Sequence, residues 1–135
     1  MGGAVSELSP SAVIDMQAVT LDFDVVVKDG RNSEPLEGAH GGPVKVRVGT
    51  LNGSPLEAAS VTLSIAGNNG KHALFKDGSA APSETVTRVT DAHGVATFTG
   101  VSVTKAGGYR LTANGNFDGV DGIPVTSNLF NIKNK

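Results

Sequence analysis

The stretch TDAHGVATFTGVSVTKAGGYRLTA, residues 90–113, predicts turns and strands in one continuous run. Its beginning, DAHG at residues 91–94, is a turn signal, because Asp can hydrogen-bond its own backbone and Gly accepts a positive φ. A strand follows, in which Ala96 and Phe98 share one face and two threonines share the other. This alternation is typical of a half-buried β-strand.

The apolar phase of that strand changes at Gly100. Val101 and Val103 continue the apolar pattern after an odd step, which a regular pleat of period two does not allow. Because glycine inside a strand pattern often marks a bulge or a sharp bend, we expect Gly100 to be one.

A second turn, KAGG at residues 105–108, precedes an alternating strand with Tyr109, Leu111 and Ala113 on one face. In immunoglobulin sandwiches, a Tyr two residues before a core Cys hydrogen-bonds back to the corner of the chain. Tyr109 and Leu111 fit that spacing, with Leu in the place of Cys. The pattern predicts a buried tyrosine corner.

Three stretches resemble the bacterial immunoglobulin-like repeats of surface and secreted proteins. Residues 90–113 are similar to the repeated pattern T-D-A-N-G-V-A-T-F-x-G-L-S-V-x-x-A-G-x-Y-x-L-T-A. VRVGTLNGSPLEAASVTLSI at 46–65 resembles the family's V-x-V-x-D-x-x-G-N-P-V-x-G-A-x-V-T-L-S-I hairpin, and SNLFNI at 127–132 resembles its closing S-N-x-F-x-I strand. The similarity spans about residues 43–132 and is interrupted at Gly49-Thr50, where the family has an acidic turn residue.

This resemblance implies an all-β chain folded as an immunoglobulin-like β-sandwich of seven or eight antiparallel strands. It also implies a spacer or adhesion role in a bacterial surface or secreted protein. We therefore expect an extracellular or cell-surface location. No basic and apolar signal segment follows Met1, so the sequence is either a fragment of a longer chain or has lost an export signal.

Composition supports the same fold class and excludes several function classes. The 135 residues include 18 Gly, six Pro and no Cys. Without Cys, disulfides, thiolate chemistry and Cys-ligated zinc are excluded. The formal net charge is −2 with both signs scattered, which gives no basic field for nucleic acid or a membrane surface. No apolar run approaches the roughly 20 residues of a membrane span.

The chain divides into residues 1–15, read as an N-terminal tail or linker, and residues 16–135, read as one sandwich domain. The first strand places Asp22 and Asp24 on the face opposite its apolar side chains, which suits an edge strand. In the last strand, we expect Leu129 and Ile132 to reach the core. The other expected strands lie at 44–48, 61–65, 72–75, 84–90, 95–103 and 109–113, and the first and last at 21–27 and 125–132.

The best candidate for ligand chemistry is NGNFDGVDG at residues 114–122, which we expect to be a loop. Oxygen-bearing side chains recur there at Asn114, Asn116, Asp118 and Asp121. Calcium prefers six to eight oxygen ligands, and loops of Asp and Asn around a Gly supply them, although a bidentate Glu further along is missing here. The same composition is also that of a plain turn. Calcium is the one cofactor that the sequence suggests.

A second candidate is the long segment 29–42, DGRNSEPLEGAHGG, which we expect to be a variable binding loop. Carbohydrate binding by a β-sandwich normally uses exposed aromatic rings, and the chain has no Trp and one Tyr. Binding through loops rich in Asn and Asp does not need such rings. The alternative function is therefore calcium or carbohydrate binding through the loops at 29–42 and 114–122, as an accessory to an extracellular enzyme.

The sequence gives little support for enzyme activity, a histidine metal site or an isopeptide bond. No serine lies in a Gly-x-Ser-x-Gly elbow, so we expect no enzyme activity. His40, His72 and His93 have no metal-ligand spacing. An isopeptide bond would need a buried acid beside an early-strand lysine and a last-strand asparagine, and the sequence places no such acid there. The residues considered for that bond are Lys28, Lys45, Asn128 and Asn131.

The sequence thus predicts a non-catalytic structural or interaction module. Its expected partners are neighbouring domains of a larger chain or another surface protein. Charged residues in the first strand and Pro124 before the last strand oppose edge-to-edge pairing. We therefore expect the isolated chain to be a monomer.

Overall fold

The computed structural model describes residues 19–67 and 73–134, and the expected tail 1–15 and His72 lie outside this part. The described chain is all-β and contains no helix. The strands are β1 (Thr20–Phe23), β2 (Gly30–Arg31), β3 (Val44–Gly49), β4 (Ser60–Ala66), β5 (Phe75–Asp77), β6 (Thr85–Val89), β7 (Val95–Phe98), β8 (Val101–Val103), β9 (Gly107–Phe117), β10 (Val120–Asp121), β11 (Val125–Thr126) and β12 (Phe130–Lys133).

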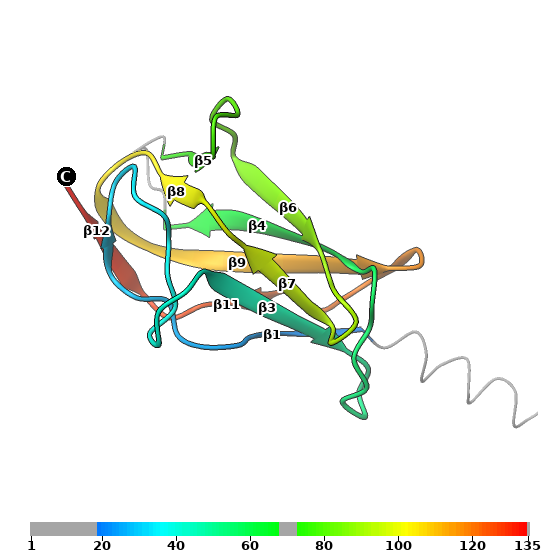
Figure 1. Ribbon diagram of the computed structural model, residues 1–135. Coiled ribbons are helices and arrows are strands. Elements are labelled where there is room, and N and C mark those ends of the chain that lie inside the picture. Colours follow the sequence, from blue (N-terminus) through cyan, green and yellow to red (C-terminus); the bar gives the residue numbers. More distant parts are fainter. Residues whose placement is uncertain (1–18, 68–72, 135) are drawn as a thin grey trace, which may run out of the picture.

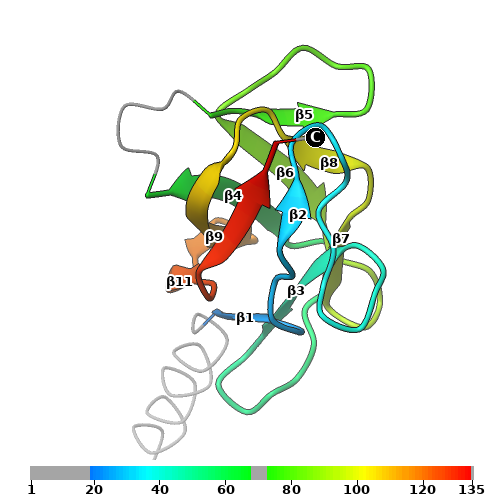
Figure 2. The same ribbon diagram turned by 90° about the vertical axis from the view of Figure 1, so that its left-hand side faces the viewer.

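The strands form three sheets (Figures 1 and 2). One has the order β1-β3-β7, and β1 is its edge, as expected. The largest has the order β2-β12-β9-β4-β6, with β10 and β11 also pairing with β9. The third is the short pair β5-β8. The long strand β9 therefore organises the largest sheet.

One hydrophobic core receives side chains from all three sheets. Val46 and Phe98 come from one sheet, Leu63 and Leu111 from another, and Phe75 from the third, each at most 1% exposed. This burial confirms the expected strand faces. Phe23, on the apolar face of β1, is only half-buried. The arrangement is consistent with a β-sandwich.

The fold-deciding stretch forms the predicted turn. The Asp91 carboxylate accepts hydrogen bonds from the N–H groups of His93 (2.8 Å) and Val95 (3.1 Å). Gly94 has φ +75°, and a Cβ there would lie 2.6 Å from the Val48 carbonyl oxygen, so only glycine fits.

Gly100 is a bend, as predicted. It has φ +76° and separates β7, which pairs with β3, from β8, which pairs with β5. The bend thus moves the chain from one sheet to another, and this is why the apolar phase changes by an odd step.

Tyr109 forms the predicted corner. The side chain is fully buried, and its hydroxyl lies 3.1 Å from the carbonyl oxygens of both Lys105 and Ala106. Burial raises the pKa of Tyr109, because it disfavours the charged phenolate. The hydroxyl therefore stays protonated and fixes the turn before β9.

The expected hairpin at 46–65 is wrong, although both of its strands exist. β3 pairs with β1 and β7, whereas β4 pairs with β6 and β9. The Asn52–Gly53 turn is present, with φ +87° at Gly53, but the chain then crosses to the other sheet. Leu56 and Ala59, which are 6% and 0% exposed, anchor this crossing in the core.

The expectation that all strands pair antiparallel is also wrong. β1 ends at Phe23, and the chain crosses to the largest sheet, where β2 runs parallel to β12. Because β2 pairs with β12, β12 is not an open edge of the sheet.

The described chain also has more strand segments than expected, because bends interrupt the longer strands.

The last strand is divided in two, which changes which of its side chains face the core. β11 and β12 are separated at residues 127–129, so Leu129 is 56% exposed, contrary to our expectation. Ile132 is buried, as expected, and Phe130 is buried in the place of Leu129. The Ser127 hydroxyl accepts a hydrogen bond from the Leu111 N–H (2.9 Å), where a regular ladder would use a backbone carbonyl.

Truncation of β9 tests this core. Leu111→Ala should lower the free energy of unfolding by about 2 to 5 kcal/mol, because the side chain is fully buried and leaves a cavity. Tyr109→Phe should cost about 1 kcal/mol, through loss of the corner hydrogen bonds. Urea unfolding measures both. An unchanged midpoint for Leu111→Ala would contradict the packing of β9.

Candidate functional site

Residues 114–122 form a β-hairpin, not the expected loop. β9 continues through Phe117, and β10 returns along it, with Asp121 opposite Asn116. The turn residues Asp118 and Gly119 have φ values of +52° and +83°. Two positive φ angles are typical of a type I′ turn, for which Asp-Gly is a favoured sequence.

The hairpin brings some of the four candidate calcium ligands together. The Asn116 side-chain amide donates to the Asp121 carboxylate (2.8 Å), and the Asn116 amide oxygen accepts from the Gly119 N–H (3.2 Å). Asn114 is paired with Thr62 of β4 and is exposed, as is Asp118. Two of the candidate ligands are thus engaged with the hairpin itself. Calcium binding here stays a prediction.

The segment 29–42 is held against the body of the protein along much of its length. The N–H of Ser33 donates to the Val103 carbonyl (3.0 Å), and the N–H of Leu36 donates to the Val101 carbonyl (2.8 Å). Leu36 is 4% exposed. Because backbone hydrogen bonds and a buried leucine fix it on β8, the segment is not the free loop that its length suggested.

A hollow of about 310 Å³ lies beside this segment. Charged side chains of both signs line it, and two of them, Lys28 and Glu37, form an ion pair of 3.5 Å, with both side chains about half exposed. Glu34 and Arg31 also line it. Most of the residues that line this hollow belong to the 29–42 segment.

The described histidines do not form a metal site. His40 and His93 are both exposed, and His93 belongs to the turn before β7. No group of three or more His, Asp or Glu residues able to hold a metal is present in residues 19–67 and 73–134.

Asn128 uses its side chain to join the first and last parts of the chain. Its amide oxygen accepts from the Val27 N–H (2.8 Å), and its amide nitrogen donates to the Val27 carbonyl (2.9 Å). Lys28 and Lys45 are both exposed. Asn128 therefore acts as a substitute for a strand pair, a role that we did not foresee from the sequence.

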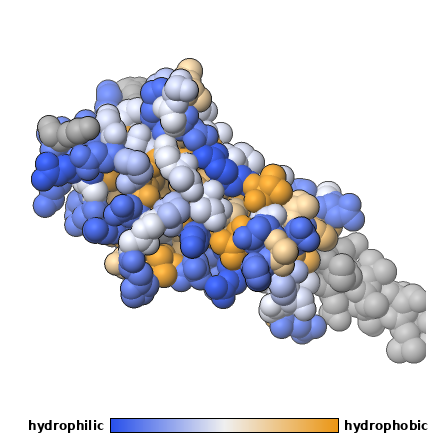
Figure 3. All heavy atoms as spheres, viewed as in Figure 1, coloured by the Kyte–Doolittle hydropathy of each residue, from blue (hydrophilic) through white to orange (hydrophobic). Residues whose placement is uncertain are grey.

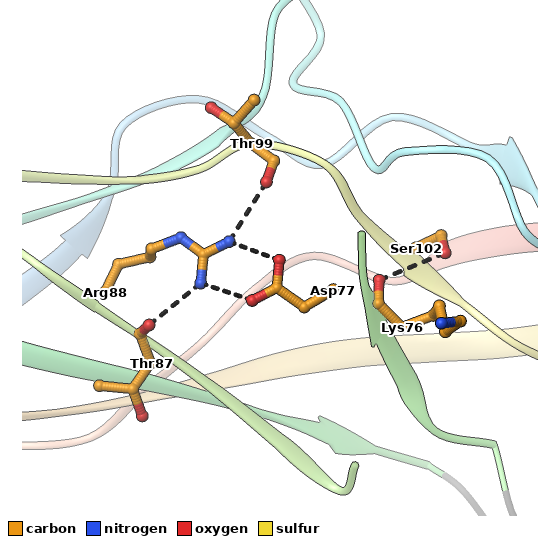
Figure 4. Close-up of polar contacts among 6 residues, drawn as sticks. All are labelled: Lys76, Asp77, Thr87, Arg88, Thr99 and Ser102. Carbon is orange, nitrogen blue, oxygen red and sulfur yellow. Dashed lines mark hydrogen bonds and ion pairs between the residues drawn. The ribbon is translucent and has the colours of Figure 1, made fainter. Parts of the chain in front are cut away.

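Figure 4 shows a polar cluster around Arg88 that sequence reasoning also missed. The guanidinium donates two hydrogen bonds to the Asp77 carboxylate (2.9 and 2.8 Å), and further bonds to the carbonyls of Thr87 and Thr99. It also lies 5.8 Å from the centre of the Phe98 ring. Arg88 thereby ties β6, an edge strand, to β5 and to the bend after β7.

The pKa of Asp77 is lowered, mainly by its hydrogen bond with Arg88 and further by the positive charge of that side chain. A bidentate pair of this kind has a defined geometry and is stronger than a single contact. Its role is structural, because the carboxylate and the guanidinium are engaged with each other and with backbone groups.

Two further hollows are present in the described chain. One, of about 340 Å³, lies where β1 and β3 meet the turn at residues 91–94, and its lining includes Asp22, Arg47 and His93. The other, of about 360 Å³, separates residues 22–26 from residues 125–128.

No protein-family model matches the chain, and no curated protein matches it either. Within the described residues, no helix is long and apolar enough to cross a membrane. The function must therefore be argued from the arrangement of the chain itself.

Removal of the Arg88–Asp77 pair tests its structural role. Arg88→Ala should lower the free energy of unfolding by about 1 kcal/mol, because the pair is only partly buried. Because the folded-state pKa of Asp77 is lower than its ordinary 3.8, its contribution is complete above pH 3.8 and is lost as pH falls through the folded value. Wild type and Asp77→Asn should converge in stability at acid pH. A difference that persists there would contradict this assignment.

Calcium should have little effect, because Asn116 and Asp121 are already bonded within the hairpin. We expect the melting temperature to be the same in EDTA and in excess calcium. A ligand that binds only the folded state raises stability by mass action, so a calcium-dependent increase would establish a site. The double variant Asn114→Ala, Asp118→Ala would then locate it.

Proposed function

We propose that this chain is a non-catalytic structural module that spaces or presents neighbouring domains at a bacterial surface or in a secreted protein. The strand order supports an immunoglobulin-like sandwich. In immunoglobulin domains, the first, second and fifth strands share one sheet and the third, sixth and seventh share the other. Here β1, β3 and β7 form one sheet, and β4, β9 and β12 belong to the other, and this division of the six strands supports the proposal.

The observation that carries the proposal is the position of the two ends. The described chain begins at one end of the molecule, and the C-terminus lies at the opposite end (Figure 1). Leu21 packs at Gly115, near the far end of β9, whereas Ile132 pairs with Gly107, at its beginning. At roughly 3.4 Å per residue, these points of β9 are about 27 Å apart. Domains joined through such ends follow one another in series.

The first and last segments are also bonded along their length, which suits a module under tension. β2 runs parallel to β12, and the Asp29 carboxylate accepts from the Asn131 N–H (2.8 Å). The Asn32 N–H donates to the Lys133 carbonyl (2.9 Å), and Asn128 bonds both backbone groups of Val27. When the two ends of the molecule are pulled apart, β2 and β12 are sheared past each other along their length. All the hydrogen bonds between the two segments are then loaded at the same time.

Ligand binding, for calcium or a carbohydrate, is the alternative. Its strongest support is the hollow of about 310 Å³ beside the 29–42 segment, which charged residues line. The two functions differ in what a ligand does. A spacer keeps its length in the presence of any candidate ligand, whereas a binding domain gains stability when its ligand is added.

Spin labels at the two ends test the proposal. The chain has no Cys, so the double variant Glu57→Cys, Asn134→Cys carries labels at these positions alone. We expect one narrow distance distribution, centred above about 25 Å and unchanged by calcium or soluble sugars. The pair Glu57→Cys, Asp118→Cys, within one end, is the control and should give a shorter distance. A broad distribution, or a shift on adding a ligand, would contradict a fixed spacer.

A further inference from the structure

The end of the molecule at which β1 begins carries acidic side chains. We call it the acidic end and define it by the start of β1, the turns at 50–57 and 90–94, and the hairpin tip at 117–121. Hydrogen bonds hold these parts together: Gly94 O accepts from Val48 N–H (2.7 Å), and Thr90 O accepts from Ala58 N–H (3.1 Å). Arg47 lies near and is paired with Asp24 (2.7 Å). The exposed acids of this end are Asp22, Glu57, Asp91, Asp118 and Asp121.

Asp91 keeps its charge over a wide pH range. The pKa of its carboxyl is lowered by hydrogen bonds from the N–H groups of Val95 and His93. Asp91 therefore keeps its negative charge to a lower pH than an ordinary aspartate does.

The opposite end, where β12 finishes, carries more cations than acids. We call it the basic end and define it by residues 29–34, 104–110 and 130–134, which are joined by hydrogen bonds such as Ser33 N–H to Val103 O (3.0 Å) and by β12–β9 pairing. Its exposed charged residues are the cations Arg31, Lys105, Arg110 and Lys133 and the acids Asp29 and Glu34. The described molecule thus has opposite charge at its two ends.

Large apolar side chains are exposed in the acidic end and directly beside it in the chain, which is a second and independent feature: Leu51 lies in the turn at 50–57, whereas Val89 and Ile123 adjoin the segments 90–94 and 117–121. Leu51 and Ile123 are each 69% exposed, and Val89 is 60% exposed. Ile123 N–H donates to the Val19 carbonyl (3.3 Å), while the Thr20 hydroxyl donates to the Gly49 carbonyl (3.1 Å). Leu51 and Ile123, which follow these bonded residues closely in the chain, therefore flank the beginning of β1.

Figure 3 shows apolar residues gathered toward this end, on a surface that is otherwise largely polar. The hollow of about 340 Å³ opens in the same region. Apolar side chains surrounded by charged ones are the usual anatomy of an interaction surface.

We propose that the acidic end of one copy binds the basic end of a second copy, head to tail. Opposite charges attract and orient the two ends, and Leu51 and Ile123 lose exposed apolar area in the contact. The proposal rests on the spacer function and gives it a mechanism: successive copies in one chain are held in line by contact between their ends.

A head-to-tail contact uses two different surfaces, and because these lie at opposite ends of the molecule, repeated contacts extend into a row. It is also weak between separate molecules, since it depends on solvent-exposed charges. Copies joined in one chain meet at an effective concentration of about 1 mM, at which a weak contact forms. The isolated chain is then a monomer when dilute and associates when concentrated.

Amide NMR spectra at increasing concentration of the whole chain test the proposal. We expect concentration-dependent shifts at both ends, in residues 50–57 and 117–121 and in residues 31–34 and 104–107, with β3 and β4 unmoved. Raising the salt from about 0.01 M to about 1 M shortens the Debye length from about 30 Å to about 3 Å, and should abolish these shifts.

Charge reversals identify the contact. Lys105→Glu and Glu57→Lys should each weaken self-association about fivefold, and a mixture of the two variants should recover it, because each supplies the charge that the other lacks. Lys45→Glu, near the start of β3, makes the same charge change outside both defined ends and should behave like wild type. Leu51→Ser should weaken association without changing its dependence on salt. Thermal melting of each variant establishes that it is folded.

Shifts confined to one end, or equal weakening by Lys45→Glu, would overturn the proposal. So would the absence of concentration-dependent shifts at low salt. None of these results changes what is expected for the spin-label distance within one copy. A narrow end-to-end distance with no association would therefore leave the spacer function standing and remove the contact between copies.

Discussion

The segment that runs from β1 to β2 is the constraint on which the rest of the structure depends. β1 pairs with β3 in one sheet, and β2 pairs with β12 in the other. A single stretch of backbone therefore links the two sheets, with Val27 buried between them and bonded to Asn128. Without this link, the two sheets would be held mainly by the apolar core and by the connections from β3 to β4, from β6 to β7 and, through β8, from β7 to β9.

The sequence predicted the faces of the strands better than their partners. The alternation of apolar and polar residues predicted which side chains of β3, β4 and β9 are buried, because successive side chains of a strand point to opposite faces of the sheet, whichever strand is its neighbour. It did not tell that β3 and β4 belong to different sheets, nor that β2 is parallel to β12. Those pairings are decided by contacts far apart in the chain, such as Asn128 with Val27, 101 residues away.

For polar side chains too, the sequence predicted contacts between near neighbours in the chain but not contacts between distant segments. Tyr109 was predictable, because its corner hydrogen bonds lie within four residues of it. Arg88 and Asp77 were not, since the sequence only shows two charges in neighbouring segments, and their pairing needs the bend at Gly100 to bring β5, β6 and β7 together. The oxygen-rich run at 114–122 was expected to be a loop, but the Asp118-Gly119 pair makes it a tight hairpin.

The charge difference between the two ends also could not be read from the sequence, where both signs are scattered. Folding collects the acids of four separate segments at one end and the cations of three at the other. The proposed serial attachment and the proposed end-to-end attraction therefore rest on the same geometry: the described chain begins at the acidic end and finishes at the basic end.

Mechanical unfolding of single molecules tests most directly whether the fold is built to transmit force between its ends. With the molecule held at residues 20 and 134, the pull loads β1 against β3 and β2 against β12 along the strands. We predict one cooperative event, releasing about 370 Å of chain, at a higher force than when the molecule is held at residues 20 and 118, both at the acidic end. Equal forces in the two directions, or extension in several small steps from low force, would contradict the account.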